Sequence, residues 1–449
     1  MRPSSAPVPA PSAEAMAAMI DKGDTAWMLV STALVLMMAI PGLALFYGGL
    51  VRAKNMLSVL MQVLTIVSIA SLVWVCWGYS LAFTSGNAVI GGLSKAFLAG
   101  VGPGSAAATF SNNVYIPELA FVAFQMTFAC ITPALIVGAF AERVKFTALM
   151  VFTVAWLTLA YLPIAHMVWY WAGPDFLPGA PDDAGLLWSL GALDFAGGTV
   201  VHINAGIAGL VGCLIIGPRI GHGREAMPPH SLVVTMLGAS LLWVGWFGFN
   251  AGSNLEANGL AALAVVNTFV AAAAAALGWA LIEGWRHGKP SLLGGATGAV
   301  AGLVAITPAS GFAAPGTSIL LGFVASAICF WCVTSLKNRL GYDDSLDVFG
   351  VHCVGGIVGA LGTAIVADPA LGGQGVLDYT RSPAVAGTFA LVPQLGKQAA
   401  AVALTLAWSG AVSAALFLAL NATIGLRPSR DVELEGLDLA EHGERAYNP

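Results

Sequence analysis

The stretch Asp194-Phe-Ala-Gly-Gly-Thr-Val-Val-His202, continued by Ile203-Asn-Ala-Gly-Ile-Ala-Gly209, places a histidine inside a segment that is otherwise suited to hydrocarbon. A shift of 150 residues brings Val201, His202, Gly206, Ile207, Gly209 and Gly212 onto Val351, His352, Gly356, Ile357, Gly359 and Gly362. This repeat indicates that the chain is a duplication. Ionisable groups at equivalent positions of two membrane-embedded halves indicate one shared site on a pseudo-twofold axis.

A single histidine among apolar residues is more commonly a satisfied core or interfacial side chain than a ligand. Two histidines in register within a repeat favour a pore-lining role. We therefore expect the rings of His202 and His352 to lie within hydrogen-bond distance of each other in the membrane core.

Composition identifies the chain as a polytopic membrane protein. Of its 449 residues 58% are hydrophobic and only 9% are charged, against about 25% charged residues in a typical soluble domain. No basic block suggests a nucleic-acid partner, and nothing in the sequence predicts an enzyme, a cofactor or a metal site. The six cysteines lie in or beside apolar runs, so neither a disulfide framework nor a redox role for the Cys329 and Cys332 pair is expected.

Apolar runs long enough to span about 30 Å of hydrocarbon predict an all-α membrane protein with eleven transmembrane helices. The runs are at 27–50, 57–83, 117–140, 147–170, 198–217, 231–250, 259–283, 292–308, 316–336, 347–367 and 399–424.

The distribution of basic residues predicts the topology. With the N-terminus outside, 13 of the 18 Lys and Arg residues fall in inside loops or in the C-terminal tail, as the positive-inside rule requires. Five spans per repeat then make the second half inverted relative to the first, with the eleventh helix outside the duplication.

The predicted domain organisation follows from this topology. Residues 1–25 form an extracytoplasmic tail without the apolar core of a signal peptide, so either a cleaved signal precedes this sequence or the tail crosses unaided. A transmembrane domain follows at 26–424, with repeat one at about 27–217, repeat two at about 231–367 and the eleventh helix at 399–424. A cytoplasmic tail occupies 425–449.

Small residues and aspartates at the repeat predict how its helices meet and begin. The pairs Ala205 with Gly209 and Gly355 with Gly359 have the small-xxx-small spacing that lets helices approach closely, and we expect them to pack the fifth helix on the tenth. Asp194 is expected to cap the fifth helix rather than to bind a substrate. Asp347 is expected to cap the tenth helix in the same way.

Taken together, these motifs resemble the Amt/Mep/Rh ammonium transporters, most closely the bacterial Amt branch. The matching stretches are Phe124-Gln-Met-Thr-Phe128-Ala, Pro163-Ile-Ala-His-Met-Val-Trp169, Asp194 to Gly209, Trp246-Phe-Gly-Phe249-Asn-Ala-Gly-Ser253, Asp347-Val-Phe-Gly-Val-His352 and Glu435-Gly-Leu-Asp-Leu-Ala-Glu-His-Gly. The loop at 171–197 departs from the family pattern because it is longer by roughly a dozen residues.

The resemblance implies a homotrimer in which each subunit has its own pore. It implies an external recruitment site at Phe128, Trp169 and Ser253, a gate of Phe128 and Phe249, a proton relay or pore pair of His202 and His352, and structural support of the site from Asp194 and Trp246. Aromatic faces can hold a small cation for about 0.5–2 kcal/mol each, and a serine hydroxyl can accept its hydrogen bonds. Gln125, Asn250 and His166 also match the family, and we expect His166 to be a packing residue.

These expectations favour an ammonium transporter that binds NH4⁺ outside, removes its proton and conducts NH3, with the proton returned or relayed through the histidines. A bare cation at the bilayer centre costs at least about 2.5–3.5 kcal/mol, and neutral imidazoles do not offset that cost. The alternatives are an ammonium sensor, which is expected to need an output module, and a passive Rh-type gas channel, which leaves Trp169 and Ser253 unexplained.

The expected partners follow from the resemblance and from the topology. They are ammonium or ammonia, its analogue methylammonium, membrane lipid, further copies of the chain and a PII-type signalling protein on the cytoplasmic face. The segment Gly436-Leu-Asp-Leu-Ala-Glu-His-Gly443 resembles the family tail that packs on the neighbouring subunit. The expected location is the cell inner membrane.

Overall fold

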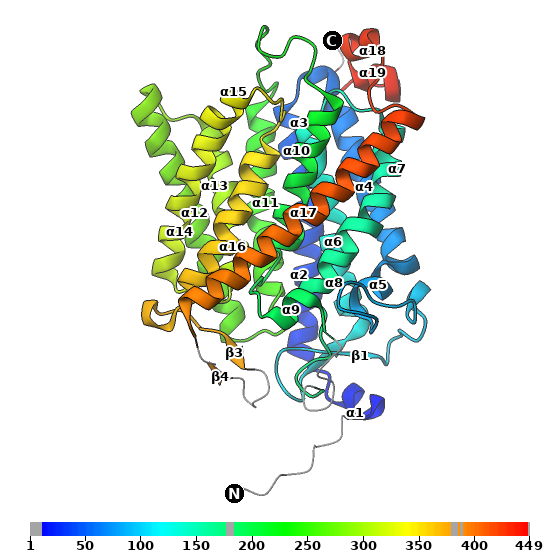
Figure 1. The fold of residues 1–449 in the computed structure, drawn as a ribbon, viewed down its shortest axis with the longest axis vertical. Coiled ribbons are helices and arrows are strands. Elements are labelled where there is room, and N and C mark those ends of the chain that lie inside the picture. The colour runs from blue at the N-terminus through cyan, green and yellow to red at the C-terminus, as the bar shows by residue number, and fades with distance from the viewer. Residues whose placement is uncertain (1–10, 177–183, 379–384, 387–388, 448–449) are drawn as a thin grey trace, which may run out of the picture.

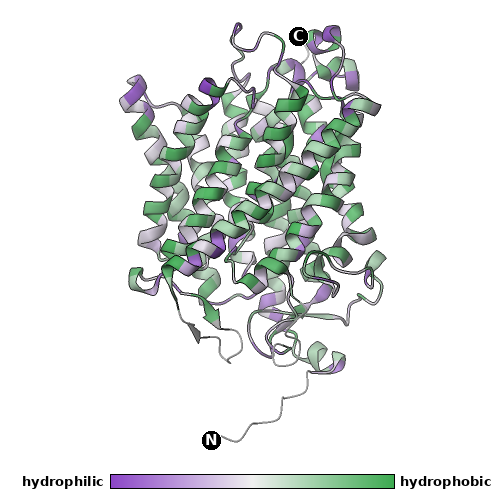
Figure 2. Ribbon diagram, in the orientation of Figure 1, coloured by the Kyte–Doolittle hydropathy of each residue, from purple (hydrophilic) through white to green (hydrophobic). Residues whose placement is uncertain are grey.

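The computed structural model of the protein describes residues 11–176, 184–378, 385–386 and 389–447. In this part of the chain eleven helices are long and apolar enough to cross a membrane, which is the predicted number. They form a single bundle, and a broad hydrophobic band lies between its more hydrophilic ends (Figures 1 and 2). The protein is therefore a multi-pass membrane protein.

Several spans consist of consecutive helical pieces joined at π-helical turns. The first half contains α2 (Lys22–Met37), η1 (Met38–Leu43) and α3 (Ala44–Leu50); η2 (Ala53–Asn55), α4 (Met56–Val73), η3 (Trp74–Gly78) and α5 (Tyr79–Phe83); α6 (Glu118–Phe140); α7 (Phe146–Trp156), η5 (Leu157–Tyr161) and α8 (Leu162–Trp169); and η6 (Gly198–Ile203) and α10 (Asn204–Ile216).

The second half also has five spans, and its fourth and fifth spans contain π-helical turns as their counterparts do. It contains α11 (Leu232–Gly252); α12 (Gly259–His287); α13 (Leu292–Ile306) and η7 (Thr307–Ala309); α14 (Pro315–Trp331), η8 (Cys332–Leu336) and α15 (Lys337–Leu340); and η9 (Phe349–Cys353) and α16 (Val354–Val366), followed by α17 (Leu391–Thr423). Both histidine segments therefore begin with a π-helical turn, η6 and η9, which supports the repeat.

Short elements decorate the two ends of the bundle. They are α1 (Ala13–Ala18), η4 (Ala96–Leu98), the antiparallel pair β1 (Ala106–Ala108) and β2 (Tyr115–Pro117), α9 (Leu186–Leu190), η10 (Pro369–Leu371), the pair β3 (Leu377–Asp378) and β4 (Val385–Ala386), α18 (Arg430–Glu435) and α19 (Leu437–His442).

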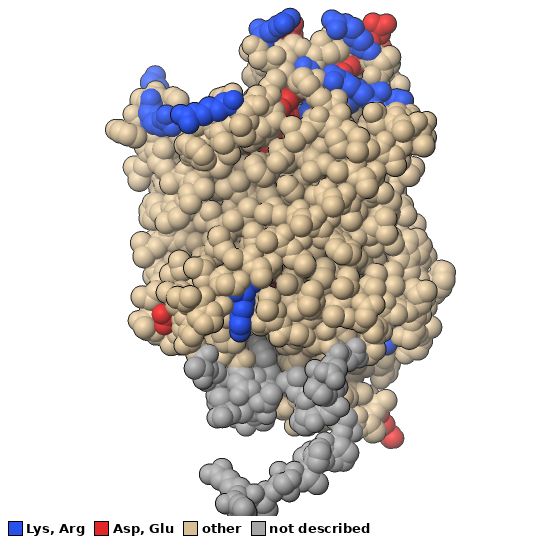
Figure 3. All heavy atoms as spheres, viewed as in Figure 1, with Lys and Arg blue, Asp and Glu red and all other residues tan. Residues whose placement is uncertain are grey.

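The two ends of the bundle differ in charge. Helix α1 lies at one end, whereas α18 and α19 lie at the other (Figure 1). On the face seen in Figure 3, Lys and Arg side chains gather mainly at the end that carries α18 and α19, and a wide band nearly free of charge separates the two ends.

The closest backbone approach between the fifth and tenth spans is at Gly206 and Gly356, which lie outside the predicted pairs. A Cβ on Gly206 would lie 2.4 Å from the Cys353 backbone nitrogen, and one on Gly356 would lie 3.0 Å from the Gly198 carbonyl oxygen. Gly209 faces Ala139 of α6 and also Val348, at the start of the predicted tenth helix, whereas Gly355 and Gly359 face α13. The prediction was therefore wrong for Gly355 and Gly359, because small residues occur on several faces of the tenth helix.

The eleventh span, α17, begins eight residues before its predicted start. Residues 391–398 contain Lys397 and two glutamines, so hydropathy alone assigns them to a loop. In the structure Gln398 is 1% exposed, and its amide bonds both the backbone nitrogen and the carbonyl oxygen of Leu193 and also the carbonyl oxygen of Ala360. Backbone partners thus replace the water that these polar residues would otherwise need.

The C-terminal tail packs on its own chain. The Asp438 carboxylate accepts hydrogen bonds from the backbone nitrogens of Leu57 (3.0 Å) and Ser58 (2.7 Å) at the start of α4. The Glu441 carboxylate accepts one from the Phe146 nitrogen at the start of α7 (3.0 Å). Carboxylates at helix N-termini satisfy donors that lack intrahelical partners.

Candidate functional site

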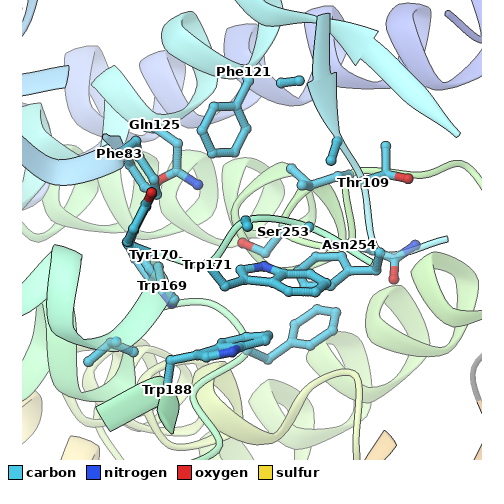
Figure 4. A pocket seen from close by; sticks show the side chains of 18 of the residues that line it. Phe83, Thr109, Phe121, Gln125, Trp169, Tyr170, Trp171, Trp188, Ser253 and Asn254 are labelled. Carbon is cyan, nitrogen blue, oxygen red and sulfur yellow. The ribbon is translucent and has the colours of Figure 1, made fainter. Parts of the chain in front are cut away.

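A cavity of about 810 Å³ opens at the end of the bundle near α1 and α9. Its wall is rich in aromatic residues, and Figure 4 shows Trp169, Trp171 and Trp188 on it together with Ser253. The rings of Trp171 and Trp188 stack with centroids 4.6 Å apart. Both tryptophans belong to the segment 171–197, of which residues 177–183 lie outside the described part of the chain.

Three residues predicted for recruitment meet at the inner end of this cavity. The Phe128 and Trp169 rings are perpendicular with centroids 5.5 Å apart, and Trp169 and Ser253 both line the cavity. The Ser253 hydroxyl donates to the Phe249 carbonyl oxygen at 2.8 Å, so its lone pairs remain to accept hydrogen bonds. The Trp169 indole nitrogen donates to the Asp194 carbonyl oxygen (3.1 Å). Trp169 can therefore offer a cation only its ring face.

The predicted gate is closed in this structure. The rings of Phe128 and Phe249 stack with centroids 4.2 Å apart and an interplanar angle of 22°, and both side chains are fully buried. Offset stacking at this distance is a favourable aromatic contact. The two rings lie between Trp169 and His202, each of which contacts one of them.

His202 and His352 meet as predicted. Their Nδ1 atoms are 3.2 Å apart, and both rings are buried. A neutral imidazole has one N–H, so in this contact one Nδ1 atom donates and the other accepts. The pair therefore holds one proton between the Nδ1 atoms and a second on one of the two Nε2 atoms.

A cavity of about 10 Å³ lies beside the two histidines. The rest of its lining is apolar and includes Ile131, Leu135, Val201, Leu242 and Trp246. The Nε2 atom of His202 is buried with no hydrogen-bond partner among the described residues. A space of this size is near the minimum that holds one water-sized molecule. The pair can therefore offer one hydrogen bond to one small guest.

The Asp194 carboxylate caps η6, as predicted. It accepts hydrogen bonds from the backbone nitrogens of Gly197, Gly198 and Thr199 at 2.6–2.8 Å and a short one from the Thr199 hydroxyl. Burial raises the pKa of Asp194, and these hydrogen bonds oppose the rise. Asp194 thus orders the start of the helix that carries His202.

The prediction that Asp347 caps the tenth span is wrong. Asp344 accepts from the backbone nitrogens of Val348 (3.0 Å) and Phe349 (2.7 Å), whereas Asp347 pairs with Lys337 and has a positive φ of 60°. Asp344 lies 150 residues after Asp194, which is the shift that relates the histidines. The repeat register, applied to the caps, would have identified it.

Trp246 packs against the histidine pair, and a second cavity reaches the pair. The Trp246 ring stacks on His202 with centroids 5.3 Å apart, and its indole nitrogen donates to the Thr307 hydroxyl (2.8 Å). On the other side of the pair a cavity of about 280 Å³ reaches His352 and is lined by Arg219, Glu283 and Asp347 among others. The histidines therefore lie between two cavities at opposite ends of the bundle.

The other matched residues divide into packing and cavity residues. Both ring nitrogens of His166 lie within 2.9 Å of backbone carbonyl oxygens, those of Ala82 and Asn87, as expected of a structural histidine. The Asn250 amide donates to the Thr268 hydroxyl at 2.9 Å. Gln125 lines the large cavity. Sequence analysis gave no role to Thr307 or Gln398, because neither belongs to a motif.

Comparison with known proteins identifies the family. A sequence profile described as Ammonium Transporter Family matches residues 26–447. This chain belongs to the ammonium transporter family. Among its relatives, an ammonium transporter of Bacillus subtilis is 46% identical over 429 residues, with 95% of this chain and 98% of the relative covered. Ammonium transporter Amt1 of Archaeoglobus fulgidus is 41% identical over 428 residues, with coverage of 95% and 99%.

Solved structures agree with this assignment. The crystal structure of Saccharomyces cerevisiae Mep2 is similar with a TM-score of 0.80 and 34% identity, covering 93% of this chain and 89% of that one. A structure described as Sensor Amt Protein has a TM-score of 0.81 and 28% identity, with coverage of 94% and 98%. The fold of the ammonium transporter family is therefore present along nearly the whole chain.

Proposed function

We propose that this protein transports ammonium across a membrane by binding NH4⁺ at the outer cavity and conducting NH3 past the histidine pair. The observation that carries the proposal is the buried contact between His202 and His352, 3.2 Å between Nδ1 atoms, beside a cavity of about 10 Å³. Family membership supports the substrate.

The outer site suits a cation and the histidine site suits a neutral molecule. Trp169 and Ser253 present a ring face and a hydroxyl oxygen to the outer cavity, both of which attract a cation. Beyond the Phe128 and Phe249 gate, the described residues around the histidines include no carboxylate among the lining groups. A bare cation there costs at least about 2.5–3.5 kcal/mol, so selection occurs when the proton is lost.

The histidine pair offers a route for that proton. If a proton reaches His202 at Nε2, the shared proton can shift to the Nδ1 atom of His352, whose other nitrogen can release one toward the inner cavity. After this transfer His202 carries its proton on Nε2 and His352 carries its proton on Nδ1. Rotation of the rings or a second proton transfer restores the starting tautomers. Transport with this relay moves charge, whereas transport of NH3 alone does not.

Purified protein in liposomes tests the proposal. An inward ammonium gradient should change the luminal pH more in liposomes that contain the protein than in liposomes without it. Capacitive current recorded on supported membranes distinguishes the proton relay from passage of neutral NH3 alone. The matched control is His202→Ala with His352→Ala, which removes both rings. Protein-dependent flux that persists unchanged in this double variant would refute the histidine pathway, and no flux in the parent would refute transport.

A sensing role is the second candidate, because this chain covers 98% of a structure described as Sensor Amt Protein. That coverage also removes the argument that a sensor must be longer than this chain. Flux separates the two functions: a sensor should bind ammonium, detected by titration of tryptophan fluorescence, without protein-dependent flux. A passive Rh-type gas channel would show flux that does not saturate.

We further propose that the end with α18 and α19 is cytoplasmic, in the cell inner membrane, and that three copies assemble. The gathering of Lys and Arg at that end supports the orientation. Exposed apolar side chains on α12 and α14, such as Leu281, Trp285 and Leu320, supply surface for lipid or for subunit contact. Cysteine accessibility at each end and mass measurement in detergent test these two statements.

The cytoplasmic face is also the proposed docking surface for a PII-type protein. The C-terminal tail packs on the starts of α4 and α7 through hydrogen bonds. Deleting residues 425–449 would therefore remove part of a packed surface. Binding of the cognate PII protein to the parent and to this deletion, with flux measured in each nucleotide state, is the test. Absence of binding and of any change in flux would leave the tail as a structural element only.

A further inference from the structure

We propose that Thr307 is a positioning residue for the histidine pair, and that it acts through the Trp246 indole to fix the plane of the His202 ring. The inference rests on the proposed function, which makes the pair part of the transport pathway. Thr307 is the first residue of η7, the short turn that ends the eighth span, and its side chain is fully buried. It belongs to neither histidine segment, so it can act on the pair only through another residue.

The Thr307 hydroxyl makes two hydrogen bonds inside the protein. It accepts one from the Trp246 indole nitrogen at 2.8 Å, and it donates its own proton to the Leu303 carbonyl oxygen, also at 2.8 Å. A hydroxyl has a single proton and two lone pairs. The bond to Leu303 therefore orients the hydroxyl as an acceptor for Trp246, and no proton remains for a transported molecule.

Trp246 connects this contact to the pore. Its ring stacks on His202 with an interplanar angle of 18° and centroids 5.3 Å apart, and it lines the cavity of about 10 Å³ beside the histidines. The χ2 torsions of histidine and tryptophan are both broad, so neither ring fixes its own plane. The nearly parallel indole restricts rotation of the imidazole in this close-packed region, provided that the indole is itself held.

The plane of the His202 ring decides which of its atoms meets His352. In the structure the two Nδ1 atoms are 3.2 Å apart, and Nε2 of His202 has no partner among the described residues. A half-turn about χ2 exchanges Nδ1 with Cδ2 and Nε2 with Cε1. The turned ring would place a carbon against His352, and the hydrogen bond that links the pair would be lost.

The same turn also supports the backbone of the His202 segment. The Pro308 carbonyl oxygen accepts a hydrogen bond from the Phe195 nitrogen at 3.2 Å. The Pro308 ring packs on Gly198, the first residue of η6, where an added Cβ would lie 2.6 Å from the proline Cγ. Turn η7 therefore contacts the start of η6 directly and holds the His202 ring through Trp246.

Thr363 offers a matched control. It is on α16 and is fully buried, and its hydroxyl donates to the Gly359 carbonyl oxygen at 2.8 Å. This is the same bond, to the residue four positions earlier, that Thr307 makes to Leu303. Among the described residues no indole donates to the Thr363 hydroxyl. Thr363→Val therefore removes a buried hydroxyl of the same kind without releasing an aromatic ring.

The first test measures maximal flux and the half-saturation concentration for ammonium in liposomes. Thr307→Val should lower maximal flux about fivefold, the size expected for loss of one hydrogen bond, and should change half-saturation little because the outer cavity is intact. Thr307→Ser keeps the hydroxyl and should restore the flux. Thr363→Val should match the parent.

A double-mutant cycle and nitrogen NMR separate positioning from packing. Trp246→Phe removes the indole N–H, so adding Thr307→Val to Trp246→Phe should lower the flux no further. In protein with isotope-labelled histidine, the parent should show a correlation through the hydrogen bond between the two Nδ1 atoms. That signal should weaken in Thr307→Val and in Trp246→Phe, and it should return in Thr307→Ser.

Each result decides the inference. A flux loss in Thr307→Val that Thr363→Val shares, or that adds in full to the loss in Trp246→Phe, overturns it. An Nδ1 correlation unchanged in Thr307→Val also overturns it, and if that variant does not fold, an unchanged correlation in Trp246→Phe does so. A parent protein without flux would instead refute the proposed transport, whereas the NMR signal would still report on the position of the ring.

Discussion

Asp194 with His202 and Asp344 with His352 occupy equivalent positions 150 residues apart, yet their halves open onto different surroundings. In both halves an aspartate accepts backbone N–H groups at the start of a π-helical turn that carries the histidine. The mouth that we propose to be outer is a cavity of about 810 Å³ with aromatic rings and the Ser253 hydroxyl on its wall. The inner mouth is about 280 Å³ and is lined by Arg219, Glu283 and Asp347 among others.

The capped histidine segments, which the two halves share, and the cavity mouths, which differ, indicate different functions. The repeat places two capped histidine segments so that the imidazoles meet, which a symmetric arrangement achieves without further residues. The mouths have no such constraint and differ in ring content and charge. We infer that the symmetric core sets what can pass, whereas each mouth sets how a cation is collected or released.

The largest expected effect comes from placing a charge in the symmetric core. His202→Asp, and separately His352→Asp, should make the protein leak potassium, because a carboxylate lowers the barrier to a bare cation. We expect potassium flux in liposomes to rise at least about tenfold, which corresponds to a barrier lower by about 1.4 kcal/mol. His230→Asp, in an inner loop, is the control. A potassium leak in only one of the two variants would contradict the functional equivalence of His202 and His352.

Removing the caps should have the next largest effect. Asp194→Asn and Asp344→Asn each leave backbone donors unsatisfied at the start of a histidine segment, at a cost of about 1–3 kcal/mol. Unfolding temperatures measured by tryptophan fluorescence in detergent should fall in both variants. Asp347→Asn, which removes the ion pair with Lys337 but no cap, should lower the unfolding temperature less. Equal losses in all three would contradict the cap assignment.

The outer mouth alone should respond to loss of its recruitment groups. Trp169→Leu combined with Ser253→Ala removes a ring face and a hydroxyl acceptor, so the half-saturation concentration for ammonium should rise about tenfold or more. Maximal flux should change less, because the histidine pair is intact. Glu283→Gln at the inner mouth is the matched control. An unchanged half-saturation would remove Trp169 and Ser253 from recruitment.

A smaller effect is expected from titration of the inner cap. Burial, with the nearby charge of Asp347, raises the pKa of Asp344 from 3.8 to about 6. The folded protein therefore favours the protonated carboxyl, and this contribution to stability is present below pH 3.8 and is lost as pH rises through about 6. The slope of unfolding temperature over this range should be smaller in Asp344→Asn than in the parent.

The sequence was enough to predict the bundle and the meeting of the histidines. Composition and apolar run length gave eleven spans, and a shift of 150 residues gave the pair that the structure places in contact. The span prediction succeeds because few architectures satisfy the backbone in lipid. The histidine prediction succeeds because a duplication keeps the same spacing between equivalent residues. The prediction of Asp194 as a cap succeeded because an N-cap is a local signal.

Other features depend on contacts that spacing does not encode. Helix rotation decides that Gly206, and not Gly209, makes the closest approach to the other half, and the sequence offered small residues on several faces. The early start of α17 depends on Gln398 bonding to Leu193 and Ala360, which lie far away in the chain. Hydropathy excludes such residues from a predicted membrane span, because a hydropathy scale scores each side chain as if its partners were water.

Helix α17 is a diagonal brace across the bundle (Figure 1). It bonds Leu193 near the outer mouth through Gln398, the Asn204 carbonyl oxygen through Ser409, and Trp156 through Ser413. At 33 residues it extends about 50 Å, longer than the hydrocarbon core. One residue inserted between Gln398 and Ser409 would turn these attachment points by about 100° relative to one another. Helix α17 therefore fixes the rotational orientation of the fourth and fifth spans relative to each other.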